Sequence, residues 1–173
     1  MNTNHDKLSK SGPSWRKASR IERVDTFDLN GPPEKIFPLL CPVLEYDWIP
    51  DWRCTMFWSR TGVAEKDVIF HTKEAFGRKA VWTCITYEPD SLIEYLVVSG
   101  KDVIMRLTLS LKKKSAEKTE MTWRMLFTMT SLLGRGVIEK SFSKEKFKAF
   151  TRLREQQIND YLEYGPKFWN RRA

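Results

Sequence analysis

Apolar and polar residues alternate with a period of two along much of this chain, which is the pattern of a β-strand with one buried face. The pattern occurs in seven segments, at 19–30, 53–60, 67–74, 79–88, 91–99, 102–113 and 118–130. Turn-forming stretches such as "EPDS" and "SGKD" separate the last six segments at short intervals. The pattern therefore predicts a curved antiparallel sheet of about seven strands, most of which pair with their neighbours in the chain.

Two regions break the alternation and predict helices. After the first strand, "GPPEKIFPLLCPVLEYDWIPDW" has prolines where a helix begins or is interrupted, so two short helices and a loop are expected. Near the end of the chain, apolar residues recur at helical spacing from Ser143 to Gly165 and Pro166, a pair that ends helices. This order of elements predicts an α+β fold, in which the sheet wraps around the long C-terminal helix and encloses a space.

The inward face of two strands follows from alternation alone. In 102–113 and 118–130, one side of each strand is apolar throughout, and it carries Met105, Leu107, Leu109, Leu111, Met121, Trp123, Met125, Phe127 and Met129. The same argument applied to 53–74 turns these side chains inward: Cys54, Met56, Trp58, Val68, Phe70 and Thr72. Methionine and tryptophan are frequent in this set, and both suit an adaptable apolar cavity as well as they suit a filled core.

The register of two hairpins extends the assignment to the strands between them. Val98 is expected opposite Val103, and Tyr87 opposite Leu92, which turns Val81, Thr83, Ile85, Tyr87, Glu94, Leu96 and Val98 inward. The outer face would then carry Trp82, Ile93, Tyr95, Val97 and Ile104. Because a solvated sheet face is rarely so apolar, this face indicates either a homodimer through Trp82, Tyr95 and Val97 or another partner surface, unless the register is wrong there.

Two charged residues interrupt the predicted apolar interior. Glu94 lies among inward leucines and valines, and Arg154 lies between Phe150 and Ile158 on the apolar stripe of the long helix. Each has a simple explanation, a strand-end carboxylate in water or a snorkelling arginine. The alternative is that both project into a wet cavity, where Arg154 pairs with Glu94 or anchors the carboxylate of a ligand.

Length and charge limit the class of protein. The chain has 173 residues and a net charge of +8, and it is expected to form one domain over 18–165, with a flexible polar tail at 1–17 and a basic tail at 166–173. The positive charge is spread out and matches no nucleic-acid-binding motif, so no nucleic-acid partner is expected. No apolar run approaches the roughly 20 residues that span a bilayer, so stable membrane insertion is not expected. The N-terminus has no apolar signal core, so the protein is expected to be cytoplasmic.

The cysteines and histidines are too few and too scattered for a metal or disulfide framework. Three cysteines (Cys41, Cys54 and Cys84) and two histidines are present, and no CxxC occurs. Neither a Ser/His/Asp set nor a phosphate-binding glycine loop is present either. No metal and no cofactor is therefore expected.

The order of elements and three segments resemble the START-like (SRPBCC) superfamily, in its polyketide cyclase/dehydrase and lipid-transfer group. The segments are "CPVLEYDWIPDW", "VWTCITYEPDSLIEYLVV" and "FKAFTRLREQQINDYLEYG", and the resemblance covers roughly 20–165. It implies a helix-grip fold whose cavity binds hydrophobic or aromatic molecules. The chain departs from the superfamily pattern at Leu44, Asp51 and Arg154, so the ligand of a relative is not carried over.

The resemblance also implies a role for the first of these segments. It would border the cavity mouth, with Tyr46, Trp48 and Trp52 as apolar walls or a gate, and with Glu45, Asp47 and Asp51 as rim acids. A rigid corner packed by aromatic side chains is the alternative. The candidate ligand-binding residues are Tyr46, Trp48, Trp52, Met56, Trp58, Phe70, Thr83, Glu94, Leu107, Trp123, Met125, Phe150 and Arg154.

Three functions remain open at this point, because the fold alone does not decide among them. The first is a carrier or sensor of a hydrophobic or aromatic small molecule, such as a lipid, a polyketide or a quinone-like compound. The second is a cyclase- or dehydratase-type enzyme with Glu94, Glu45 or Tyr46 as its acid or base. The third is a protein-interaction module that uses the outer sheet face.

Overall fold

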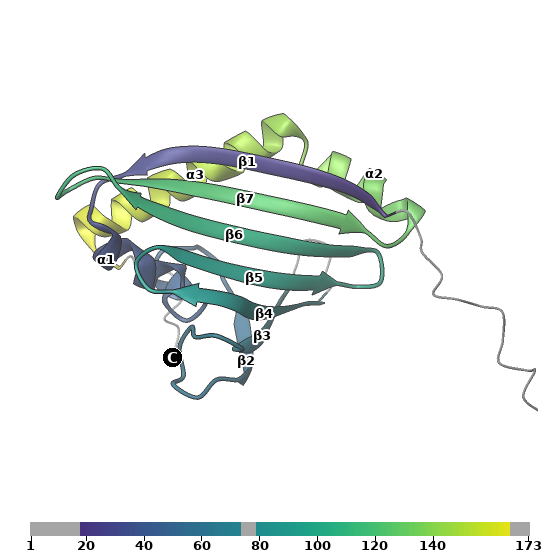
Figure 1. The fold of residues 1–173 in the computed structure, drawn as a ribbon, viewed down its shortest axis with the longest axis horizontal. Coiled ribbons are helices and arrows are strands. Elements are labelled where there is room, and N and C mark those ends of the chain that lie inside the picture. Colours follow the sequence, from purple (N-terminus) through teal and green to yellow (C-terminus); the bar gives the residue numbers. More distant parts are fainter. Residues whose placement is uncertain (1–17, 74–78, 167–173) are drawn as a thin grey trace, which may run out of the picture.

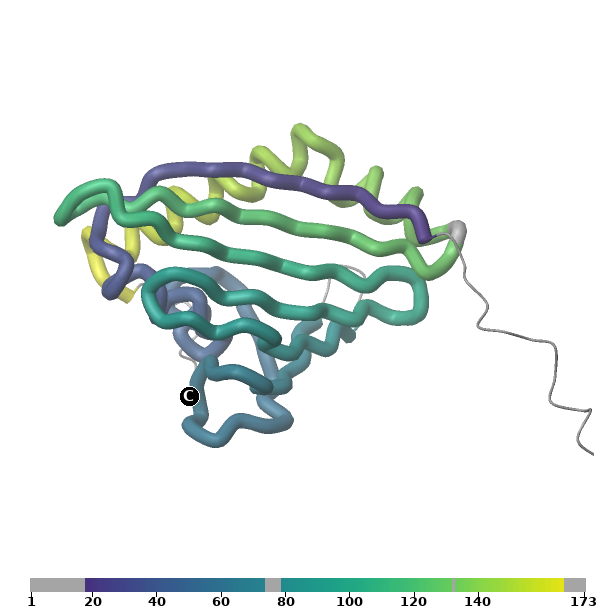
Figure 2. Tube along the Cα trace, viewed as in Figure 1, coloured from purple at the N-terminus to yellow at the C-terminus, as the bar shows by residue number. Residues whose placement is uncertain are grey.

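The computed structural model describes residues 18–73 and 79–166, so the predicted tails fall outside the described residues, except for Pro166. Seven antiparallel strands form one sheet in the order β1-β7-β6-β5-β4-β3-β2. Their bounds are β1 (Ser19–Leu29), β2 (Cys54–Trp58), β3 (Ile69–Lys73), β4 (Lys79–Glu88), β5 (Leu92–Ser99), β6 (Val103–Lys113) and β7 (Thr119–Met129). The long strands run side by side, and the segment between β2 and β3 projects at one edge (Figure 2).

The helices lie on one face of this sheet (Figure 1). They are α1 (Pro33–Ile36), the 3-10 helices η1 (Phe37–Leu40) and η2 (Leu44–Asp47), α2 (Leu132–Ser141) and α3 (Lys144–Tyr164). The α+β helix-grip fold is therefore confirmed. The sequence did not predict α2, whose glycines Gly134 and Gly136 weaken a helical pattern. Within the described residues, no helix is long and apolar enough to cross a membrane.

Polar contacts fix α3 against the sheet. Ser143 caps its N-terminus by accepting a hydrogen bond from the amide of Lys146, and Gly165 ends it with φ of +77°. Midway along the helix, the carboxylate of Asp25 on β1 accepts hydrogen bonds from Lys148 Nζ at 2.5 Å and from the Thr151 hydroxyl. The helix therefore cannot slide along the sheet without breaking these bonds.

The predicted register of β5 is wrong by one residue. Ser99, not Val98, pairs with Val103, so the β5–β6 turn has three residues and begins at Gly100 with φ of +56°. At the other end of β5, Glu88 pairs with Leu92, because Asp90 adopts φ of +61° in another three-residue turn. A slip of one residue exchanges the two faces of a strand.

The slip moves the predicted outer patch into the interior. Ile93, Tyr95 and Val97 are between 1% and 3% exposed, whereas Val98 is 42% exposed. On β4, a register shift between Cys84 and Thr86 leaves Tyr87 packed against the core, as predicted. The same shift turns Trp82 inward and Val81 outward. The residues on which the homodimer and the interaction module were predicted, Trp82, Tyr95 and Val97, therefore face the interior.

Candidate ligand cavity

A cavity of about 630 Å³ lies between the inner face of the sheet and the helices. Most of its lining is apolar, and it comes from β3 to β7, from the segment 40–52, and from α2 and α3. Its polar side chains lie in two groups, Glu45 with Arg154, and Ser99, Asp102, Lys140 and Ser141. Apolar cavities of this size with a few polar groups are typical of small-molecule sites. The interior is thus hollow, which the sequence left undecided.

Two rows of side chains across the sheet form one wall. Tyr95, Leu107 and Met125 are aligned on β5, β6 and β7, and Val97, Met105 and Phe127 form the next row. Beyond them, Phe70 on β3 stacks on Trp82 on β4, with ring centroids 5.6 Å apart. The strands hold these side chains at fixed spacing, so this wall keeps its shape without a ligand.

The facing wall comes from the helices. Phe150 on α3 meets the edge of Trp123 with ring centroids 5.4 Å apart, and Val137 and Ile138 on α2 also line the cavity. The indole N–H of Trp123 is buried and has no hydrogen-bond partner among the described residues. An unpaired buried donor of this kind is uncommon, and it is available to a ligand acceptor if the ring shifts slightly.

The segment from Cys41 to Trp52 is held by hydrogen bonds from its aromatic side chains. Trp48 Nε1 donates to the Leu39 carbonyl at 2.9 Å, and Trp52 Nε1 donates to the Pro42 carbonyl at 2.8 Å. The Tyr46 hydroxyl donates to the Cys54 carbonyl and accepts from the Cys54 amide. This geometry favours the rigid corner over a mobile gate.

Glu45 and Arg154 are the ionisable pair of the cavity. Burial raises the pKa of Glu45 to about 8, and the positive charge of Arg154 opposes this only in part. Burial also lowers the pKa of Arg154, although a guanidinium keeps its proton throughout the physiological range. At neutral pH the cavity thus contains a protonated carboxyl group beside a cation.

Seven of the thirteen candidate ligand-binding residues line the cavity. They are Trp52, Phe70, Leu107, Trp123, Met125, Phe150 and Arg154. Trp48 is buried behind Arg154, Met56 packs against the core, and Tyr46 is hydrogen-bonded to Cys54, but none of the three lines the cavity. Trp58 is 49% exposed, because β2 has an irregularity between Met56 and Trp58.

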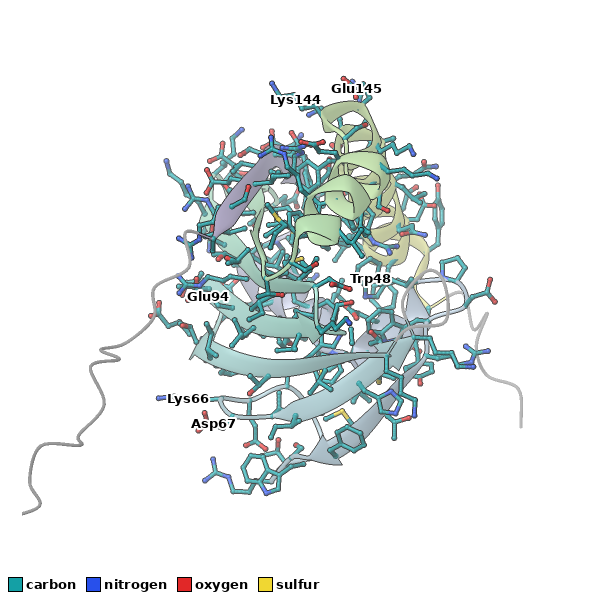
Figure 3. The ribbon with its side chains drawn as sticks, turned by 90° about the vertical axis from the view of Figure 1, so that its right-hand side faces the viewer. Trp48, Lys66, Asp67, Glu94, Lys144 and Glu145 are labelled. Atoms are coloured by element: carbon teal, nitrogen blue, oxygen red, sulfur yellow. The ribbon has the colours of Figure 1, made fainter. Side chains whose placement is uncertain are left out.

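Thr83 and Glu94 do not reach the cavity, because the register slip places them on the outer face. Figure 3 shows Glu94 on the far side of the sheet from Trp48 and the helices. Its carboxylate accepts hydrogen bonds from Thr86 at 2.7 Å and Thr108 at 2.8 Å. The predicted pairing of Glu94 with Arg154 is therefore wrong, and Glu45 is the acid that lies near Arg154.

The cavity residues that the sequence missed include residues of β4, β5 and α2. Trp82, Tyr95 and Val97 were assigned to the wrong face, and the residues of α2 were not assigned to any helix. In β5, Ile93, Tyr95 and Val97 alternate with a set that includes Glu94, so the more apolar side was the signal for the inner face. In the described part of the chain, no three His, Cys, Asp or Glu side chains are grouped to hold a metal ion.

Comparison with known proteins rests on structure. No family model matches the chain, and no curated protein matches its sequence. Norcoclaurine synthase from Thalictrum flavum superposes with a TM-score of 0.67 at 10% identity, over 88% of this chain and 99% of that one. An uncharacterised protein from Rhizobium leguminosarum superposes with a TM-score of 0.59 at 13% identity, over 87% of this chain and 99% of that one. DynU16, from the dynemicin biosynthetic locus, superposes with a TM-score of 0.57 at 12% identity, over 84% of this chain and 48% of that one.

The chain has the START-like (SRPBCC) fold. At identities this low, the similarity shows the fold and does not transfer an activity. Norcoclaurine synthase has also been solved in complex with dopamine and hydroxybenzaldehyde. The chemistry of this chain therefore depends on the residues that line its own cavity.

Proposed function

We propose that this protein binds a hydrophobic or aromatic small molecule in the cavity, as a carrier or sensor. The observation that carries the proposal is a space of about 630 Å³ with a mostly apolar lining. Filling such a space with a ligand removes apolar surface of both partners from water, which is favourable by about 25 cal/mol per Å² of buried apolar surface. The START-like fold of known ligand-binding and biosynthetic proteins also supports it.

Native mass spectrometry of freshly purified protein, followed by extraction of any bound compound, tests this proposal. Uptake of N-phenyl-1-naphthylamine, a neutral fluorescent probe, is the parallel assay. Val97→Phe should fill part of the cavity and weaken probe binding at least tenfold. Val98→Phe, the adjacent residue on the outer face, is the matched control and should bind the probe as the wild type does.

A clean mass with no adduct, together with no probe uptake, would contradict the proposal. Equal loss of binding in Val97→Phe and Val98→Phe would also contradict it, because the probe would then be bound outside the cavity.

A second candidate function is acid–base catalysis by Glu45. The supporting observation is that burial raises the pKa of Glu45 to about 8, in the range where a carboxyl group both takes up and releases a proton near neutral pH. Its ionised form, which predominates only above about pH 8, is suited to removing a proton next to a ligand carbonyl. Deuterium incorporation into 2-tetralone in D2O, followed by NMR, should then be faster with the wild type than with Glu45→Gln. Equal rates would exclude this role for Glu45.

A further inference from the structure

We propose that the ligand is an apolar acid whose anionic head group binds between the side chains of Glu45 and Arg154. The proposal rests on the proposed function, because it assigns a chemical class to the ligand of the same cavity. Its basis is that the hydrogen-bonding capacity at this end of the cavity is left unused.

Arg154 is partly buried in the cavity wall and has no anionic hydrogen-bond acceptor among the described residues. Its Nη1 donates to Gln157 Oε1 at 2.6 Å, and its Nε is buried with no partner among the described residues. The guanidinium packs on the ring of Phe150, 4.9 Å from the centroid, and 5.8 Å from that of Trp48. Aromatic faces attract a cation but do not accept its hydrogen bonds in the way a carboxylate does.

Glu45 does not supply the missing acceptor. It lines the cavity beside Arg154, yet the two side chains form no direct ion pair, and no side chain of the described residues donates a hydrogen bond to Glu45. A protonated carboxyl group adds no negative charge, and its remaining acceptor oxygen forms no hydrogen bond with Arg154. The Glu45 hydroxyl and the Nε–H of Arg154 therefore lie at the same end of the cavity, and neither donates to an acceptor among the described residues.

A third unused donor lies close to this pair. Trp123 is 4% exposed, and its indole N–H has no partner, while its ring contacts Phe150, the same ring on which Arg154 packs. The Glu45 hydroxyl, the Arg154 Nε–H and the Trp123 indole N–H thus lack acceptors among the described residues, and they match a ligand that brings acceptor oxygens. A neutral carbonyl would use the hydrogen bonds but would leave the cation uncompensated, whereas an anion satisfies both.

The second group of polar residues in the cavity, which includes Asp102 and Lys140, does not lack hydrogen-bond partners in the same way. Asp102 already accepts a hydrogen bond from the Ser131 hydroxyl at 2.5 Å, and Lys140 is exposed to solvent. Neither group needs a ligand to satisfy it. The head group is therefore assigned to Glu45 and Arg154, and the apolar body of the ligand extends along the sheet toward α2.

Displacement of N-phenyl-1-naphthylamine at pH 7 by dodecanoic acid and by dodecan-1-ol tests the assignment. The two compounds share their chain and differ in the head group. The wild type should bind the acid at least tenfold more tightly than the alcohol. Arg154→Met, which keeps an apolar stem and loses the charge, should remove this preference and change probe and alcohol affinity less than twofold.

Arg152→Met is the matched control, because Arg152 is an exposed arginine of the same helix, and it should keep the wild-type preference. Arg154→Gln is the second variant if Arg154→Met does not fold, and the same loss of preference is expected. Binding of the probe and the alcohol without preference for the acid would overturn the head-group assignment and leave the proposed function standing. So would equal weakening of all three compounds by Arg154→Met. Failure of all three to bind the wild type would overturn both proposals.

Discussion

Glu94 and Glu45 lie on opposite sides of the same sheet and differ in how their carboxyl groups are satisfied. Glu94, on the outer face of β5, accepts hydrogen bonds from Thr86 on β4 and Thr108 on β6. Glu45, on the inner side, receives no hydrogen bond from any described side chain and lies near one cation. The outer carboxylate is therefore fully used in joining three strands, whereas the inner carboxyl group is free to interact with a ligand.

The same difference holds for the two faces as a whole. On the outer face, polar pairs link β1 to β7, among them Thr26 with Thr122 at 3.3 Å and Arg124 with Glu22 at 3.1 Å. On the inner face, the side chains are mainly apolar, and the few polar groups remain partly unpaired. A polar residue in a strand is thus a better indication of a site when its hydrogen bonds are missing than when it merely interrupts an apolar pattern.

The largest expected effect is on the pH dependence of stability. The pKa of Glu45 is about 8 in the folded protein and near its ordinary value of 4.5 in the unfolded chain. The folded state therefore holds more protons between these values, so stability falls as pH rises through this window. In Glu45→Gln this contribution is absent. Between pH 5 and pH 8.5 the free energy of unfolding of the wild type should therefore fall by about 4 kcal/mol relative to that of the variant, because one pH unit corresponds to about 1.36 kcal/mol.

Urea unfolding of both proteins at the two pH values measures this difference. The other titratable groups near Glu45 are Arg154 on α3, Tyr95 on β5 and Cys54 on β2. Burial raises the pKa of Tyr95 and of Cys54, so both stay neutral across the window. An identical pH response of wild type and variant would mean that Glu45 is ionised at neutral pH, and the contrast with Glu94 would be lost.

The next effect compares the two faces at neighbouring positions of β5. Val97 is 1% exposed on the cavity side, and Val98 is 42% exposed on the outer side. Val97→Thr puts a hydroxyl group into an apolar wall and should lower the free energy of unfolding by about 1–3 kcal/mol. Val98→Thr should change it by less than about 0.5 kcal/mol. Urea denaturation of both variants decides the register, since a larger loss in Val98→Thr would favour the register that the sequence suggested.

The sequence was sufficient for the fold because its signals there are local and repeated. Period-two alternation located all seven strands, and Gly165 with Pro166 located the end of α3. The register of β5 failed because it depends on the conformation of Gly100 and Asp90, and a four-residue turn and a three-residue turn fit the same residue types. The one-residue slip at these two turns thus moved Tyr95 and Val97 to the wrong face.

The polar end of the cavity was only partly predictable for a different reason. The helical stripe identified Arg154 as a charge on an apolar face, which is a local signal. Its neighbour Glu45 belongs to a segment far away in the sequence, and only the tertiary fold, which also places Trp48 against Arg154, brings the two together. The sequence therefore paired Arg154 with Glu94, the acid that its strand pattern had placed inside.

The smallest expected effect is that of Glu94→Gln, which tests the outer half of the comparison. The amide keeps one acceptor oxygen and loses the charge, so the bonds from Thr86 and Thr108 weaken and unfolding should become easier by about 1 kcal/mol. Because the side chain points away from the cavity, the affinities for N-phenyl-1-naphthylamine and dodecanoic acid should stay within twofold of the wild type. Stability from urea denaturation and affinity from fluorescence separate the two effects. A Glu94→Gln protein that lost its preference for the acid, as Arg154→Met is expected to do, would place Glu94 in the site, and the distinction between a satisfied and an unsatisfied carboxyl group would fail.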